Sequence, residues 1–210
     1  MRRRPPAGPV TLPPHAAGMT VGLYGGSFDP PHAGHLHVSR LALARLGLDR
    51  VWWLVTPGNP LKDTGGLAPV AGRLAAARAL ARDPRMVVSD VEARLGLRYS
   101  VDTLAALTAR APGVRFVWIM GADGLAQFHR WRDWRGIAAM APLAVIDRPG
   151  WTLAATASPA ARALARFRMD EADAGLLARS APPAWVFLHG PRSGLSSTAI
   201  RAGTGPRLRR

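Results

Sequence analysis

The sequence predicts an α/β fold, a Rossmann-like doubly wound parallel sheet in a single domain. Short, continuous apolar runs alternate along the chain with segments of helical composition. Strands that read as unbroken apolar runs are typical of parallel sheets covered on both faces. The chain has 210 residues, 48% of them hydrophobic, which is enough to bury the core of one such domain. In a sheet of this kind, ligands bind at the carboxyl ends of the strands.

The expected elements follow one another in regular order. We expect strands at residues 21–24, 51–55, 86–89, 115–120, 143–146 and 185–188. Helices are expected at residues 34–46, 70–81, 100–110, 136–140 and 159–167, with a final helix starting near residue 196 or 197. Ser100 is expected to cap its helix, because its hydroxyl can accept a backbone N–H. The polar, proline-containing residues 168–184 predict a loop or an irregular helix.

The ends of the chain are strongly basic. The formal net charge is +15, and residues 2–4 and 207–210 hold six arginines. Without these six the charge is +9, and the other arginines are scattered, so we do not expect nucleic acid as a partner. We expect a disordered basic extension at residues 1–18, a catalytic domain at 19–202 and a flexible basic tail at 203–210.

The composition also bears on where the protein is located in the cell. No apolar run reaches the roughly 18 residues that a membrane helix needs. The sequence has no cysteine, so it forms neither disulfides nor thiolate metal sites. We therefore expect a cytoplasmic protein without membrane contact. Whether it is a monomer or a homo-oligomer is left open.

The most informative segment is residues 25–35, GGSFDPPHAGH, between the first expected strand and helix. A glycine turn before a helix N-terminus lets a phosphate approach backbone N–H groups and the positive end of the helix dipole. His32 and His35 are three apart, so on a helix they point to one side and can donate to phosphoryl oxygens. Gly34 between them allows a ligand to come close. The alternative, ordinary histidines at a helix start, is the weaker interpretation for a pair behind such a turn.

A second segment, residues 196–201, predicts an anion site near the C-terminus. Its sequence is SSTAIR, in which Ser197, Thr198 and Arg201 share one helix face. Hydroxyl groups at a helix start, with a guanidinium beside them, form a cradle for phosphate. The alternative is a simple N-cap with a surface arginine. Lys62 is the single lysine among 28 Lys and Arg residues, which indicates a role for a compact ammonium group, or else one surviving surface lysine.

Together these segments resemble the motifs of the adenylyltransferase branch of the HxGH nucleotidyltransferase superfamily. Further segments are similar to those of nicotinate-nucleotide adenylyltransferases and occur in the same order, namely residues 57–62, 99–104, 116–123, 128–132 and 148–150. The resemblance covers roughly residues 19–202. It implies adenylyl transfer from ATP to nicotinate mononucleotide, giving nicotinate adenine dinucleotide and pyrophosphate, in NAD biosynthesis.

The resemblance also implies roles for individual residues. His32, His35, Lys62 and Arg201 would act on the reacting phosphates. The expected ATP site consists of Gly25, Gly26, Ser27, Phe28, Gly34, Gly121, Asp123, Ser197, Thr198 and Arg201. The expected mononucleotide site consists of Thr103, Trp131 and Arg132, with Trp131 stacking on the pyridine ring. For Trp131 the alternative is core packing, since the chain has seven tryptophans.

We expect one cofactor, Mg²⁺, and we consider several alternative functions. Few carboxylates cluster near the motifs, so Mg²⁺ is expected to be held mainly by ATP phosphates and water, as is usual for this ion. The nearest alternatives are other enzymes of the superfamily that use nicotinamide mononucleotide or phosphopantetheine. An alternative of a different class is a basic nucleic-acid-binding module.

Overall fold

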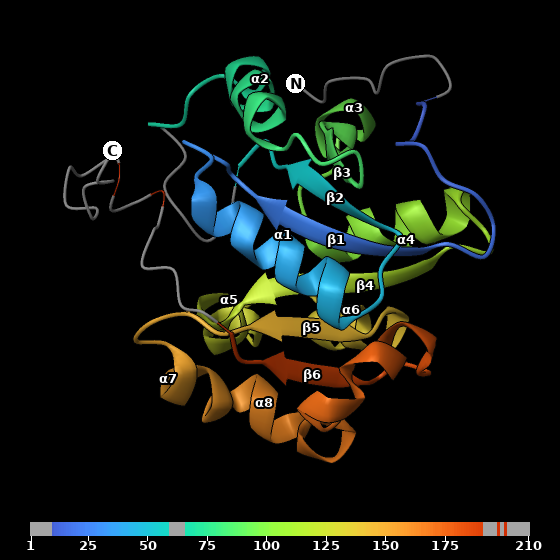
Figure 1. Cartoon of the computed structure of the whole chain (residues 1–210), viewed down its shortest axis with the longest axis vertical. Helices are drawn as coiled ribbons and strands as arrows, with labels where there is room; N and C mark the ends of the chain where they lie inside the picture. The colour runs from blue at the N-terminus through green and yellow to red at the C-terminus, as the bar shows by residue number, and fades with distance from the viewer. Residues whose placement is uncertain (1–9, 59–65, 191–196, 198–199, 201–210) are drawn as a thin grey trace.

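Six parallel strands form one sheet at the centre of the structure, a computed structural model that describes residues 10–58, 66–190, 197 and 200 (Figure 1). The strand order is β3-β2-β1-β4-β5-β6, and each neighbouring pair is parallel. The strands are β1 (Thr20–Gly26), β2 (Arg50–Val55), β3 (Met86–Ser89), β4 (Arg115–Gly121), β5 (Leu143–Ile146) and β6 (Trp185–Leu188). This order reverses direction between β1 and β4, which is where a doubly wound sheet binds its ligands. The predicted fold class is confirmed.

Helices cover both faces of the sheet (Figure 1). One face carries α1 (Ala33–Arg45), α2 (Val70–Leu80) and the 3₁₀ segment η2 (Glu171–Arg179). The other carries α3 (Val91–Leu95), α4 (Ser100–Arg110), α5 (Ala122–Phe128), α6 (Trp134–Met140), α7 (Thr152–Thr156) and α8 (Pro159–Ala163). Because both faces are covered, the central strands are apolar throughout, as the unbroken runs in the sequence predict. Within the described part of the chain, no helix has the length and apolar character needed to cross a membrane.

Two helix predictions need correction. The N-cap of α4 is Tyr99, and Ser100 is the first helical residue; no side chain caps this end. The helix expected at residues 159–167 ends at Ala163, and the 3₁₀ segment η1 (Ala165–Phe167) follows. The carbonyl of Leu164 accepts the Phe167 N–H at 3.0 Å, an i to i+3 bond of the tighter 3₁₀ turn, and also accepts the Trp185 indole N–H at 2.8 Å.

The structure describes residues 10–18 of the segment that was expected to be a disordered extension. Residues 10–18 have defined contacts with the domain: Val10 and Leu12 pack against the core, and the Thr11 carbonyl accepts Arg94 at 2.8 Å. His15 meets Trp52 edge-on, with ring centroids 6.0 Å apart. Apolar burial therefore fixes this segment against α3 and the sheet. Residues 1–9 and 203–210 lie outside the described residues.

Candidate active site

The turn after β1 is built around an inward-facing phenylalanine. Phe28 has φ +49°, an uncommon value for a residue with a bulky side chain. Its ring is fully buried and stacks on Trp53, with centroids 4.9 Å apart and planes 11° apart. A Cβ on Gly26 would lie 3.2 Å from the same ring. The glycine thus leaves space for Phe28, and burial holds the turn in its unfavourable backbone conformation.

His32 and His35 lie side by side at the start of α1. Their ring centroids are 3.9 Å apart, and each side chain is only 7% exposed. His32 is the N-cap residue, and its Nδ1 accepts the Gly34 N–H at 3.1 Å. In turn, the His35 Nδ1 accepts the His32 N–H at 3.1 Å. The predicted pairing of the two rings is confirmed, although His32 precedes the helix instead of lying within it.

These two hydrogen bonds fix the protonation state of the rings. A nitrogen that accepts an N–H carries no proton, so in the neutral ring the proton sits on Nε2. Burial lowers the pKa of His32 to about 4 and that of His35 to about 2, and the Arg148 charge acts in the same direction on both. At neutral pH the pair therefore offers two Nε2–H donors without a net charge of its own.

The lowered pKa values predict how stability depends on pH. Below the ordinary histidine pKa of 6.5, the unfolded chain binds protons that the folded chain does not. The free energy of unfolding should therefore fall as the pH drops from 6.5 to about 4 for His32, and further towards 2 for His35. Urea unfolding of wild type and of a His32→Asn/His35→Asn double variant between pH 4.5 and 7.5 checks this. The variant should lose less stability on acidification; equal losses would contradict the prediction.

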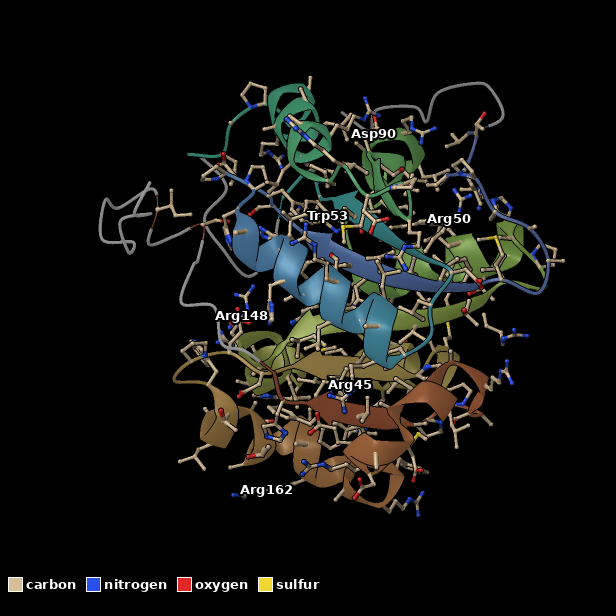
Figure 2. The ribbon with its side chains drawn as sticks, in the orientation of Figure 1. Arg45, Arg50, Trp53, Asp90, Arg148 and Arg162 are labelled. Atoms are coloured by element: carbon tan, nitrogen blue, oxygen red, sulfur yellow. The ribbon has the colours of Figure 1, made fainter. Side chains whose placement is uncertain are left out.

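Arg148 is the cation whose charge acts on both histidines of this pair. It follows β5, at the edge of the sheet where the strand arrowheads end (Figure 2). Its Nη1 lies 3.4 Å from Asp123 Oδ2, and its charge acts on the buried Tyr24 hydroxyl. Burial raises the pKa of Tyr24, so this hydroxyl stays protonated beside the guanidinium. The sequence places 148–150 in a family segment but does not single out Arg148 as a site residue.

Gly121 provides the space for this ion pair. A Cβ at Gly121 would lie less than 3.0 Å from both Asp123 Oδ1 and Arg148 Nε. Gly121 ends β4 and Asp123 lies in the first turn of α5, so the Asp123–Arg148 pair lies near the switch point of the sheet, next to β1. The predicted site residues Gly121 and Asp123 are thus brought to the same edge as the histidines.

The C-terminal motif contacts the N-terminal one through Ser197. The Ser197 hydroxyl donates to the Pro30 carbonyl at 3.0 Å, across 167 positions of sequence. Pro30 lies two residues before His32, so this bond joins the second predicted phosphate segment to the first. Lys62, Thr198 and Arg201 lie outside the described residues.

Trp131 lies on the face of the sheet that α4, α5 and α6 cover, opposite the face that carries α1. Its ring is partly buried and meets Trp118 edge-on, with centroids 6.3 Å apart. A Cβ on Gly25 would in turn lie 3.7 Å from Trp118, so the turn and Trp131 flank the same indole. The Arg132 guanidinium lies 4.6 Å above the Tyr99 ring, and its Nη1 is 3.9 Å from Asp102 Oδ2. Tyr99, Asp102 and Arg132 therefore form a rim beside Trp131.

Thr103 has a different environment from the one expected for a ligand-binding hydroxyl. It is fully buried, and its hydroxyl lies 2.9 Å from Glu92 Oε1 and 3.2 Å from the Tyr99 carbonyl. Burial raises the pKa of Glu92, and its Oε2 has no hydrogen-bond partner in the described structure. Thr103 and Glu92 thus form buried contacts that stabilise the first turn of α4. The sequence analysis did not identify Glu92.

The side chains at this edge of the sheet are better suited to bind a phosphate group than to coordinate a metal ion. Among the described residues, no group of three or more His, Cys, Asp or Glu side chains is placed to hold a metal ion. Asp123 is close to the site, and it is paired with Arg148. The remaining groups are N–H and cationic donors, which match the oxygens of a polyphosphate.

Comparisons with known proteins agree with this geometry. The model of the cytidylyltransferase-like family matches residues 23–203. A curated protein of Methylorubrum extorquens, named "Probable nicotinate-nucleotide adenylyltransferase", is 63% identical over 183 residues, which is 87% of this chain and 99% of that protein. A protein of the same name from Rhizobium meliloti is 59% identical over 184 residues, 88% of this chain and 98% of that protein.

A solved structure shows the same fold. It is the Plasmodium falciparum nicotinic acid mononucleotide adenylyltransferase complexed with NaAD, with a TM-score of 0.66 and 16% identity, covering 88% of this chain and 83% of that one. The chain therefore belongs to the cytidylyltransferase-like family, a family of nucleotidyltransferases. Within it, the chain groups with the nicotinate-nucleotide adenylyltransferases.

Proposed function

We propose that this enzyme transfers the adenylyl group of ATP to nicotinate mononucleotide, giving nicotinate adenine dinucleotide and pyrophosphate. The observation that supports this most is the pair of adjacent imidazoles at the N-terminus of α1, whose Nδ1 atoms accept backbone N–H groups, joined through Pro30 to the second phosphate segment at Ser197. The named relatives at about 60% identity support the choice of substrates. The enzyme would thus act late in NAD biosynthesis, on cytoplasmic nucleotides.

The chemistry requires alignment more than proton transfer. A phosphate oxygen of the mononucleotide attacks the α-phosphorus of ATP, a new P–O bond forms, and the bond to the β-phosphate breaks so that pyrophosphate leaves. The attacking oxygen is already anionic and needs no general base. His32 and His35 would donate to the α-phosphate, where charge develops. Arg148, whose charge acts on both histidines, would stabilise the same developing charge.

The other predicted residues would hold the rest of the substrates. Ser197, Thr198 and Arg201 are proposed to bind the β- and γ-phosphates, and Lys62 to neutralise them from another side. Gly121 and Asp123 would flank the nucleoside, and Ser27 and Phe28 would contribute backbone N–H groups. Gly34, whose N–H is taken by His32, would let the ligand come close to the start of α1. Mg²⁺ would arrive with ATP, bound mainly to its phosphates, and would supply charge neutralisation there.

Trp131 is proposed to stack on the pyridine ring, with Arg132 near the nicotinate carboxylate. Trp131→Ala should raise KM for the mononucleotide by about tenfold, which corresponds to the roughly 1.4 kcal/mol of a good aromatic contact. KM for ATP should stay within about twofold in the same kinetic assay. Trp131→Phe, which keeps an aromatic face, should recover most of the loss. A parallel rise in both KM values would show that Trp131 only supports the core.

The reaction itself is tested by pyrophosphate release from purified enzyme. ATP with nicotinate mononucleotide should give the highest kcat/KM in a panel that includes nicotinamide mononucleotide, phosphopantetheine and CTP. A preference for nicotinamide mononucleotide or phosphopantetheine would replace the proposed acceptor. Release with none of these pairs, together with salt-dependent binding of RNA or DNA, would favour the nucleic-acid-binding alternative.

A further inference from the structure

Arg73 is a buried arginine that no motif singled out. It lies on α2, only 3% exposed, at the position where an amphipathic helix would place an apolar side chain. Its neighbour on the same helix face is the buried Ala77. A charged group is rarely buried this deeply unless its donors are satisfied. The contacts of this guanidinium therefore need an explanation.

Those contacts are backbone carbonyls from separate segments. Nη1 donates to the Ser27 carbonyl at 2.6 Å and to the Thr56 carbonyl at 2.9 Å. Nε donates to the Ala68 carbonyl at 2.8 Å, and Nη2 reaches the Pro57 carbonyl at 3.5 Å. Arg73 thus ties together the turn after β1, the end of β2 and the entry to α2. Arginine suits this role because its five N–H donors radiate from one plane.

A carboxylate in the same turn completes the arrangement. Asp29 acts electrostatically on Arg73 and raises its pKa, against the larger lowering effect of burial. Asp29 Oδ2 also accepts the Ala68 N–H at 3.2 Å. The turn after β1 and the segment before α2 are therefore joined twice, once through Arg73 and once through Asp29.

The bond to Ser27 has a consequence for the phosphate site. In a trans peptide group the carbonyl and the following N–H point in opposite directions. The Ser27–Phe28 peptide is trans, and its carbonyl faces Arg73 on α2. The Phe28 N–H consequently points away from α2. Phe28 itself is held at φ +49°, so this peptide orientation depends on outside support.

We propose that Arg73 is a positioning residue that sets the orientation of the Ser27–Phe28 peptide and joins the phosphate-binding turn to the loop after β2. The proposal rests on the proposed function, because it assigns Arg73 to the same phosphate site. Arg73 touches neither substrate; it acts through the backbone that does. Lysine has one ammonium centre and cannot reach carbonyls of three segments in one plane.

The test compares Arg73→Lys and Arg73→Ala with Arg78→Ala, a matched control because Arg78 is an exposed arginine on the same helix. Pyrophosphate release should show kcat lowered by about 10²-fold in Arg73→Ala, the usual loss when reacting groups are displaced by about 1 Å, and by about tenfold in Arg73→Lys. Arg78→Ala should match wild type. Added methylguanidinium should raise kcat of Arg73→Ala in a saturable way and leave wild type and Arg78→Ala unchanged.

Folding is measured on each variant so that activity is expressed per folded molecule. If Arg73→Ala does not fold, Arg73→Lys carries the test. The proposal is overturned if kcat per folded molecule stays within about twofold of wild type, or if methylguanidinium restores nothing to folded Arg73→Ala. If wild type releases no pyrophosphate with nicotinate mononucleotide, the proposed function fails instead. Arg73 is then judged by calorimetric binding of a non-hydrolysable ATP analogue, which Arg73→Lys should weaken and which unchanged affinity would contradict.

Discussion

Replacing His35 by alanine should lower kcat by about 10²–10³, the loss expected when one preorganised donor to a developing charge is removed. The ring is held by the His32 N–H and packs 4.7 Å from the Phe28 ring, so its Nε2–H has a fixed direction. A donor that needs no reorientation stabilises the transition state more than the bound substrate. KM for ATP should therefore change much less than kcat. Steady-state pyrophosphate release with both substrates varied measures the two quantities.

His37→Ala is the matched control for this experiment. His37 lies on the same helix, two residues further on, and is more exposed than His35. Its removal should leave kcat unchanged, while urea unfolding verifies that both variants are folded. If His35→Ala turned over at the wild-type rate, the two imidazoles would have no part in the chemistry.

Arg148→Met should reduce kcat/KM for ATP by about 10² or more. The substitution removes the positive charge that acts on both histidines, and it leaves Asp123 without its ion-pair partner. An unpaired carboxylate next to incoming phosphates would repel ATP, which adds a binding defect to the loss of charge stabilisation. Arg148→Lys keeps the charge and loses the planar fork, so its activity should be intermediate. Kinetics with ATP as the varied substrate separates the variants.

The control for Arg148 is Arg162→Met on α8, an exposed side chain that points outward from the molecule (Figure 2). It changes the net charge by the same amount and should leave kcat/KM for ATP unaltered. A second comparison, Arg148→Met combined with Asp123→Asn, removes the unpaired carboxylate and should bind ATP better than the single variant. Equal losses of kcat/KM in the Arg148 and Arg162 variants would show that the effect comes from the net charge of the protein and not from the position of Arg148.

The sheet could be predicted because its strands are buried on both faces and leave an unbroken apolar signal. The elements that escaped prediction are short: α3, α5 and α7 have five to seven residues. Two turns or fewer are too short to show a period of 3.6, so their sequences look like loops. At the change from α8 to η1, the Leu164 carbonyl accepts the Trp185 indole N–H from the sheet, a contact with no local signal in the sequence.

The site divides in the same way. Paired histidines behind a glycine turn are a local pattern, and the structure brings them together as the spacing indicates. Arg148 and Arg73 carry no such pattern, because Arg148 pairs with Asp123, 25 positions away in the sequence, and Arg73 donates to backbone carbonyls. Thr103 shows the opposite case: its motif is visible in the sequence, while its buried bond to Glu92 is not. An arginine two residues after a strand, at the carboxyl edge of a parallel sheet, was the signal that could have found Arg148.

We propose above that two segments, joined by the Ser197–Pro30 hydrogen bond across 167 positions of sequence, bind the same triphosphate. A crystal structure of the enzyme with a non-hydrolysable ATP analogue tests it most directly. We expect the α-phosphate within about 3.2 Å of the Nε2 atoms of His32 and His35, with the β- and γ-phosphates next to Ser197. A triphosphate bound away from the imidazoles, or with its outer phosphates directed away from Ser197, would contradict it.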